Sequence, residues 1–220
     1  MIAFILAELA GWNNYCGSRS IKFVIYCCAL TGITCLLRPD ICFPVLITVF
    51  AWLGMGAFRP EEGESEEKTW IREARLTPWK LIAAKILSSF LVTLLHLIII
   101  LPVFILATSI WGIPWSTIGF IGLILILTAI TAAIFELLLK QSVWIEPFQR
   151  ILVVFIWFAI VTFIPNFRVL SPFTWAFRIT LRGAGRDTLT SLGLNLLFMF
   201  ILTIVTRIFI KKENWNSDEN

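Results

Sequence analysis

Apolar residues in this chain gather into long runs that short polar segments separate. Six of these runs predict helices, at about residues 21–37, 41–58, 81–110, 118–139, 144–164 and 189–210. A helix of about 20 apolar residues crosses the hydrocarbon core of a bilayer. The run 81–110 exceeds one bilayer thickness and contains Pro102, so we expect it to tilt, kink or project. The pattern predicts an all-α membrane protein of six transmembrane helices, in a single domain over residues 1–220.

The segments outside these runs predict three further features. The apolar run of residues 2–12 is too short to span the membrane. It ends at Trp12, and Tyr15 follows. We therefore expect an N-terminal interfacial helix, with these two aromatic residues at the headgroup level. Residues 59–80 are strongly charged and join the second and third runs. The segment between the fifth and sixth runs is rich in aromatic residues and arginine.

Composition supports the same class of protein. Of the 220 residues, 59% are hydrophobic and 15% are charged, and the mean hydropathy is +0.89. A soluble domain of this size cannot hide so much apolar surface. Composition therefore excludes a soluble enzyme, a secreted disulfide scaffold and a disordered tail. The net charge is +4, from 18 basic and 14 acidic residues. The basic residues stand at the ends of apolar runs. This distribution indicates membrane topology and no nucleic acid partner.

Lys and Arg residues beside the spans predict the orientation. With a cytoplasmic N-terminus, the outer side carries five of the 18 basic residues, namely Arg38, Arg168, Arg178, Arg182 and Arg186. The inner side carries the other 13, namely Arg19, Lys22, Arg59, Lys68, Arg72, Arg75, Lys80, Lys85, Lys140, Arg150, Arg207, Lys211 and Lys212. We therefore expect a multi-pass protein of the cell membrane with both termini cytoplasmic.

Catalytic motifs are missing from the sequence. His96 is the one histidine, so no pair of histidines can hold a metal, and neither a G-x-S-x-G elbow nor an ATP-binding G-x-x-x-x-G-K-[ST] loop occurs. Cysteines lie in the first fifth of the chain without zinc spacing, and are best explained as small apolar residues. We expect no metal site and no enzyme activity of the chain by itself.

The charged segment 59–80 predicts an amphipathic helix that could dock a soluble partner. We expect Trp70 on its apolar side, and Arg72, Glu73 and Arg75 on its charged side. Thr77-Pro78 ends this helix. Lys80 and Lys85 then precede and enter the third run, and we expect both to extend to the lipid headgroups.

This segment resembles the signature of type-2 ABC exporter permeases. The family has a stretch E-x-G-T-L after its second span, then a T-P or S-P turn, and then a hydrophobic run with Lys. At those places this chain has Glu67-Lys68-Thr69-Trp70, Thr77-Pro78 and residues 81–85, with Lys68 in place of Gly. A second match, LSPFTWAFRITLRG at residues 170–183, is similar to the family's N-P-L-T-Y-x-x-E-A-L-R-G, with Arg178 in place of the acid.

The resemblance implies the transmembrane subunit of an ATP-driven exporter. Two permease chains would assemble with two separate ATPase subunits, which would bind ATP and Mg. The helix with Glu67, Thr69, Trp70, Arg72, Glu73 and Arg75 would couple to the ATPase. The segment with Arg168, Arg178 and Arg182 would form an outer re-entrant element before the sixth span. The cargo would be hydrophobic or amphipathic: a peptide, a lipid-linked glycan or a drug.

Polar residues inside the spans are the remaining candidates. His96, Glu136 and Asn195 either line a transport pathway or are satisfied by neighbouring helices. Two other functions also fit the sequence: a membrane-integral assembly or immunity factor without transport activity, and an ion-coupled carrier. A carrier is expected to show buried carboxylates at mid-membrane, and Glu136 is the one acid inside an apolar span.

Overall fold

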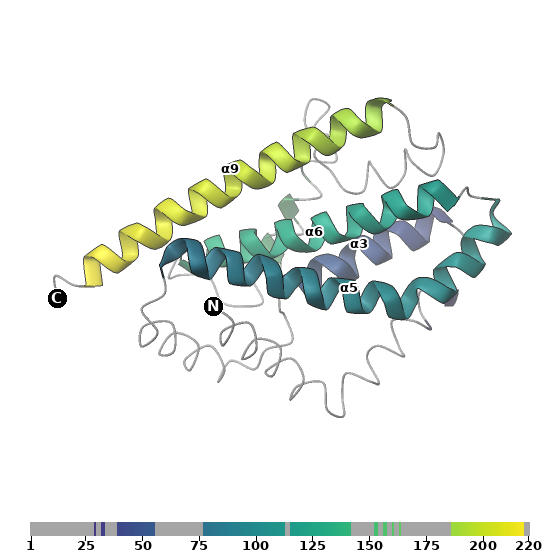
Figure 1. Cartoon of the computed structure of the whole chain (residues 1–220), viewed down its shortest axis with the longest axis horizontal. Helices are drawn as coiled ribbons and strands as arrows, with labels where there is room; N and C mark the ends of the chain where they lie inside the picture. The colour runs from purple at the N-terminus through teal and green to yellow at the C-terminus, as the bar shows by residue number, and fades with distance from the viewer. Residues whose placement is uncertain are drawn as a thin grey trace.

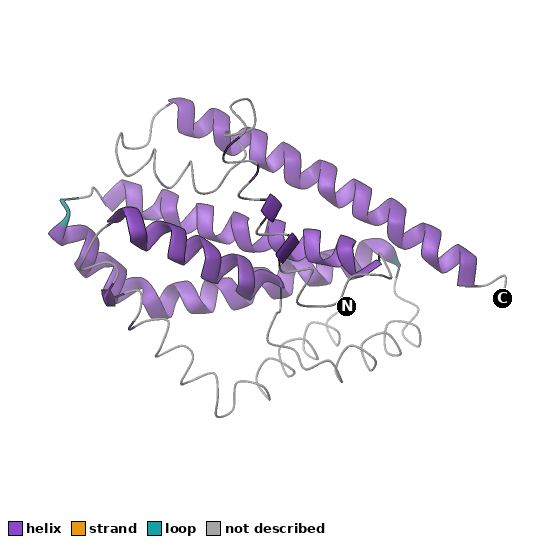
Figure 2. Cartoon of the chain, turned by 180° about the vertical axis from the view of Figure 1, so that it is seen from behind, coloured by secondary structure: helices purple, strands orange, loops and turns teal. Residues whose placement is uncertain are grey.

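The structure, a computed structural model, describes residues 29, 32–33, 39–55, 77–112, 115–141, 152–153, 156–157, 160, 163 and 186–217. Its four elements are the helices α3 (Pro39–Met55), α5 (Pro78–Ile110), α6 (Trp115–Gln141) and α9 (Arg186–Ser217), which pack side by side (Figure 1). Within these described ranges no strand occurs, and coloured by secondary structure they are helix with short turns (Figure 2). The all-α prediction is confirmed for this part of the chain.

Three helices are long and apolar enough to cross a membrane. Their apolar parts are Pro78–Ile110, Ile118–Leu139 and Leu192–Ile210, which confirms the predicted runs 81–110, 118–139 and 189–210 as helices. The apolar part of α3, Val45–Met55, is shorter. The predicted N-terminal helix, the coupling helix and the re-entrant segment lie outside the described residues, as do most of the runs 21–37 and 144–164.

Local signals at both ends of α5 explain its bounds. Pro78 fits the first turn of a helix because its missing N–H has no partner there, and the Leu81 N–H donates to the Thr77 carbonyl at 3.1 Å. Gly112 follows the helix with a φ of 67°, and its N–H donates to the Ser109 carbonyl at 3.2 Å. The helix runs through Pro102 and bends near its end (Figure 1).

The packed clusters fix the direction of each helix. Residues early in α3, such as Leu46, pack with Ile121 early in α6 and with Phe104 late in α5. Further along, Met55 packs with Ala132. In the same way α9 follows α6, because Leu202 packs with Ile130 and Ile134. Thus α3, α6 and α9 run in one direction and α5 runs in the opposite direction (Figure 1).

Small residues bring α3 and α6 into close contact. Gly54 lies against the backbone of Ala129, where a Cβ atom would collide with the carbonyl group. Ala51, Ala132 and Ala133 are fully buried nearby. Helices in membranes gain packing contacts from such small residues, because they let the two backbones approach each other.

The surface of the bundle is apolar on α5 and α9. In its most apolar part, α6 has 56% of its residues buried inside the bundle, whereas α5 has 29% and α9 has 17%. The exposed side chains on α5 include Leu87, Leu91, Leu95 and Ile98, which share one face by their spacing. A helix that exposes apolar side chains along its length is suited to contact with lipid.

Aromatic contacts join the outer helices to the bundle. The ring of Trp157, from the predicted fifth run, stacks on Phe198 of α9 and also meets Phe135 of α6, each with a centroid distance of 6.0 Å. At the end where α5 begins, the Arg207 guanidinium of α9 lies 4.7 Å from the ring centroid of Trp79. Aromatic and basic side chains of this kind are typical of the membrane interface.

Candidate functional site

A group of buried polar residues on α5 is the strongest candidate site. Lys85, Ser88, Ser89, Thr93 and His96 are all buried, although they lie inside an apolar helix. Their spacing places them on the face opposite the exposed Leu87, Leu91 and Leu95. We call these five residues the α5 polar stripe. Polar groups inside a membrane bundle are costly unless they find partners, so each one needs an explanation.

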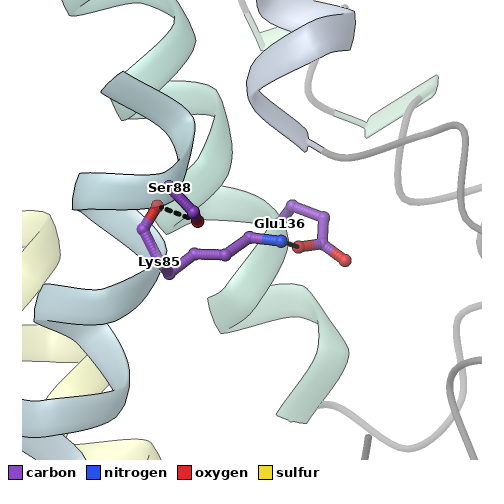
Figure 3. Close-up of polar contacts among 3 residues, drawn as sticks. All are labelled: Lys85, Ser88 and Glu136. Carbon is purple, nitrogen blue, oxygen red and sulfur yellow. Dashed lines mark hydrogen bonds and ion pairs between the residues drawn. The ribbon is translucent and has the colours of Figure 1, made fainter. Parts of the chain in front are cut away.

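Lys85 and Glu136 form an ion pair between α5 and α6 (Figure 3). The Lys85 Nζ lies 3.6 Å from the Glu136 Oε2, and the two side chains are 8% and 11% exposed. Beside the pair, the Ser88 hydroxyl donates to the Lys85 carbonyl at 3.1 Å. The pair lies towards the end of the bundle where α5 begins and α6 ends, because Leu137 and Ile210 pack with Leu81 in one cluster there.

The sequence-based expectation for Lys85 is therefore wrong. We expected its side chain to extend to the headgroups, but it points into the bundle and meets Glu136. The reason is the direction in which position 85 faces: Lys80 is exposed, while position 85 lies on the side of α5 that packs on α6. A buried charge next to an opposite charge is far less costly than a buried charge alone.

Two hydroxyls of the α5 polar stripe are unusual. Thr108, Thr128, Thr203 and Thr206 each donate to a carbonyl of the preceding helical turn, at 2.8 to 3.0 Å. In contrast, the Ser89 Oγ and Thr93 Oγ1 atoms are buried and have no hydrogen-bond partner among the described residues. A buried hydroxyl that lacks a partner costs on the order of 1–3 kcal/mol.

His96 ends the stripe near the middle of α5. Its Nδ1 atom lies 2.8 Å from the Val92 carbonyl oxygen. Because a carbonyl oxygen only accepts hydrogen bonds, Nδ1 carries a hydrogen. The imidazole is buried, with 4% of its surface exposed. His96 is therefore oriented by its own helix through Nδ1.

The three predicted pathway residues belong to three different helices. His96 lies on α5, Glu136 on α6, and Asn195 on α9, where it is half-buried. Lys85, the partner of Glu136, stands eleven positions before His96, which is about 16 Å along a helix. The structure thus brings Glu136 against Lys85 and keeps it well away from His96.

The predicted coupling residues and outer arginines belong to other parts of the chain. Glu67, Thr69, Trp70, Arg72, Glu73, Arg75, Arg168, Arg178 and Arg182 all lie outside the described residues. Within the part of the chain that the structure describes, no group of three His, Cys, Asp or Glu side chains comes together as a metal site would require.

Sequence reasoning missed the role of Lys85 although a signal was present. A single acid in an apolar span predicts a basic partner at the same depth on a neighbouring helix. Lys85 follows the start of α5 by seven positions, and Glu136 precedes the end of α6 by five. In two antiparallel neighbours those positions lie at similar depth, so the pairing was within reach of the sequence.

Comparisons with known proteins find no relative of this chain. No model of a protein family matches the chain, and searches of curated proteins and of solved structures find no similar protein.

Proposed function

We propose that this chain is the transmembrane subunit of an ATP-driven exporter that works with a separate ATPase subunit. The observation that carries the proposal is the order of the two permease-like segments, 67–85 and 170–183, along the chain. The directions of the helices support it. In a six-span chain, spans two, four and six run in one direction and span three runs in the other, as α3, α6, α9 and α5 do.

The proposed molecule has six spans with both termini in the cytoplasm, an interfacial N-terminal helix, and a re-entrant outer segment with Arg168, Arg178 and Arg182. Trp157 supports the fifth span, because it packs between Phe135 of α6 and Phe198 of α9. A second copy of this chain or a similar permease completes the pore, and a hydrophobic or amphipathic cargo moves along the interface between the two. ATP and Mg belong to the ATPase partner.

The position of the ion pair supports a route for coupling. The proposed coupling helix, with Glu67, Thr69, Trp70, Arg72, Glu73 and Arg75, leads directly into α5 at Pro78. A push from a closing ATPase would therefore be transmitted directly to the first turns of α5. Lys85 ties those turns to Glu136 of α6, so that the two helices move together.

An ion-coupled carrier is less well supported. Such a carrier needs a carboxylate that binds and releases its ion near mid-membrane. Glu136 stands near the end of α6 and is paired with Lys85. No observation favours an assembly or immunity factor over a transporter.

The experiment is co-expression of the chain with P-loop ATPase subunits encoded in the same genome, followed by pull-down and ATPase measurements. Trp70→Ala should release the ATPase or abolish its stimulation while the permease remains in the membrane, because a buried Trp anchor typically contributes roughly 2 kcal/mol or more to an interface. Lys140→Ala, near the other inner turn, is the matched control and should have a smaller effect.

Two results would contradict the proposal. One is an unchanged pull-down and unchanged ATPase stimulation with Trp70→Ala, which would mean that Trp70 only anchors the chain at the headgroups. The other is ATP turnover by the purified chain without any partner, since the sequence has no loop that can hold a triphosphate.

A further inference from the structure

The seam between α5 and α6 continues inward from the ion pair as a row of buried hydroxyls. Lys85, Ser89, Thr93 and Leu97 follow one another at intervals of four residues, which places them along one side of the helix. Both ends of this row contact α6: Lys85 pairs with Glu136, and the Leu97 side chain packs over Gly122. Ser89 and Thr93 lie between those ends and therefore lie along the same seam.

The facing part of α6 offers small side chains and one hydroxyl. At about the depth of Ser89 and Thr93, an antiparallel α6 has Ala132, Ala129 and Thr128, all of them buried, and the two alanines also pack on Gly54 and Met55 of α3. The Thr128 hydroxyl donates to the Ile124 carbonyl at 2.8 Å, and its oxygen can still accept a hydrogen bond. A buried water molecule needs polar partners, and in this seam the hydroxyls of Ser89 and Thr93 would supply them.

We propose that Ser89 and Thr93 bind water molecules in this seam, and that these waters connect the Lys85–Glu136 pair to His96. Buried water typically bonds to polar groups that lack protein partners, which is the condition of the Ser89 and Thr93 hydroxyls. The Lys85 carbonyl, which Ser89 would reach by bonding back along α5, accepts a hydrogen bond from the Ser88 hydroxyl instead. The site thus binds water, and the bound water molecules transfer protons along the seam.

The proton route is chemically balanced. A proton enters from the side where α5 begins, is passed along hydrogen bonds between waters and the two hydroxyls, and reaches the imidazole of His96. For each proton that the ring receives it returns one to the waters, so its charge is restored, and Nδ1 lies against the Val92 carbonyl. Among the described side chains, the buried titratable groups on this route are Lys85, Glu136 and His96; α3 adds only the Cys42 thiol.

This inference does not depend on export or on an ATPase, so its test uses the purified full-length chain in lipid nanodiscs. Because the chain has one histidine, labelling with ¹⁵N-histidine gives the NMR signals of His96 alone. The quantity measured is the rate at which the ring hydrogens of His96 exchange with bulk water. In the natural chain we expect rapid exchange despite the burial of the ring.

Thr93→Val should slow this exchange about tenfold or more, because it removes a hydroxyl at nearly constant side-chain volume. Thr93→Ser keeps the hydroxyl and should retain rapid exchange, which separates the hydroxyl from the packing. Thr108→Val is the matched control: its hydroxyl already bonds to the Phe104 and Ile105 carbonyls, and it lies beyond His96 on α5. Ser89→Ala should act in the same direction as Thr93→Val.

Two outcomes would overturn the inference. One is a ring hydrogen of His96 that is protected from exchange in the natural chain, which would mean that Ser89 and Thr93 turn back to their own helix. The other is equal exchange in the natural chain, Thr93→Val and Ser89→Ala, which would mean that protons reach His96 by another route. Because Thr93→Val and Ser89→Ala each remove a hydroxyl at a different position, loss of folding in one variant leaves the other informative.

Discussion

The ion pair of Lys85 and Glu136 is the feature on which single residues have most influence. Each charge is nearly removed from solvent and lies close to the opposite charge, which offsets part of the cost of burial. The pair also joins the helix that follows the proposed coupling segment to its neighbour α6. Stability and coupling are therefore expected to respond together to substitutions at positions 85 and 136.

Lys85→Met should destabilise the protein by roughly 3–5 kcal/mol, because it leaves the Glu136 carboxylate buried without its partner. The exchanged pair, Lys85→Glu with Glu136→Lys, should recover more than half of this loss. Reversible unfolding in mixed micelles measures both effects. Lys80→Met is the control, since Lys80 is exposed, and should change the free energy of unfolding by less than about 0.5 kcal/mol. An exchanged pair as unstable as the single variant would show that the charges are compensated by other groups.

At the scale of the helices, small residues decide how closely α3 and α6 approach. Gly54→Ala should cost about 1–3 kcal/mol, because its Cβ would collide with the Ala129 carbonyl and force the two backbones apart. Gly119→Ala and Gly193→Ala are matched controls: both glycines are exposed in helices and a Cβ there meets no atom within 4 Å. Thermal unfolding in detergent should show neutral or slightly stabilised controls, and equal melting temperatures in all three variants would refute the close packing.

The two sides of α9 should respond differently to truncation. Leu202 is 6% exposed and packs with Ile130 and Ile134, so Leu202→Ala should cost about 2–5 kcal/mol. Leu197 is 53% exposed, and Leu197→Ala should cost less than about 1 kcal/mol if lipid fills the space. The same unfolding measurement compares them. A large cost at Leu197 would instead indicate that protein, such as a second copy of the chain, covers this face.

Hydropathy was sufficient to predict the helices but not their ends. The runs 81–110 and 118–139 lie inside α5 and α6, and the structure extends both at their starts, to Pro78 and Trp115. The start of α5 follows from Thr77 and Pro78, which are a capping signal and not an apolar one. In the same way α9 extends to Ser217, because polar residues continue a helix without adding to the apolar run.

The candidate site was predicted only in part, for a physical reason. His96 and Glu136 stand out in the sequence because ionisable groups are rare inside apolar spans. The rotation of α5 about its own axis, relative to α6, decides whether Lys85 faces the headgroups or the bundle. A hydropathy pattern does not give this rotation. Thr93 was expected to bond to helix backbone or to a neighbouring helix, and Ser89 does not stand out in the sequence, since hydroxyls in membrane helices usually bond to the preceding turn, as Thr108 and Thr128 do.

For the whole molecule, the orientation in the membrane can be tested directly. The distribution of basic residues predicts that position 64 is cytoplasmic and that positions 113 and 172 face outside. In a chain without its natural cysteines, single cysteines at 113 and 172 should react with an impermeant thiol reagent in intact cells. A cysteine at 64 should react only after the membrane is opened. Labelling at position 64 from outside would reverse the proposed topology.

Among the three long apolar helices, α9 is the least buried, and this has a consequence for biosynthesis. The contacts among α3, α5 and α6 involve only residues before 142, so they can form while the ribosome is still translating the rest of the chain. Helices in membranes insert first and associate afterwards, and the Lys85–Glu136 pair belongs to this early unit. When α9 leaves the translocon, Ile210 packs over Leu81 and Leu137 beside the pair. The last helix thus covers a charge pair that the nascent chain has already neutralised.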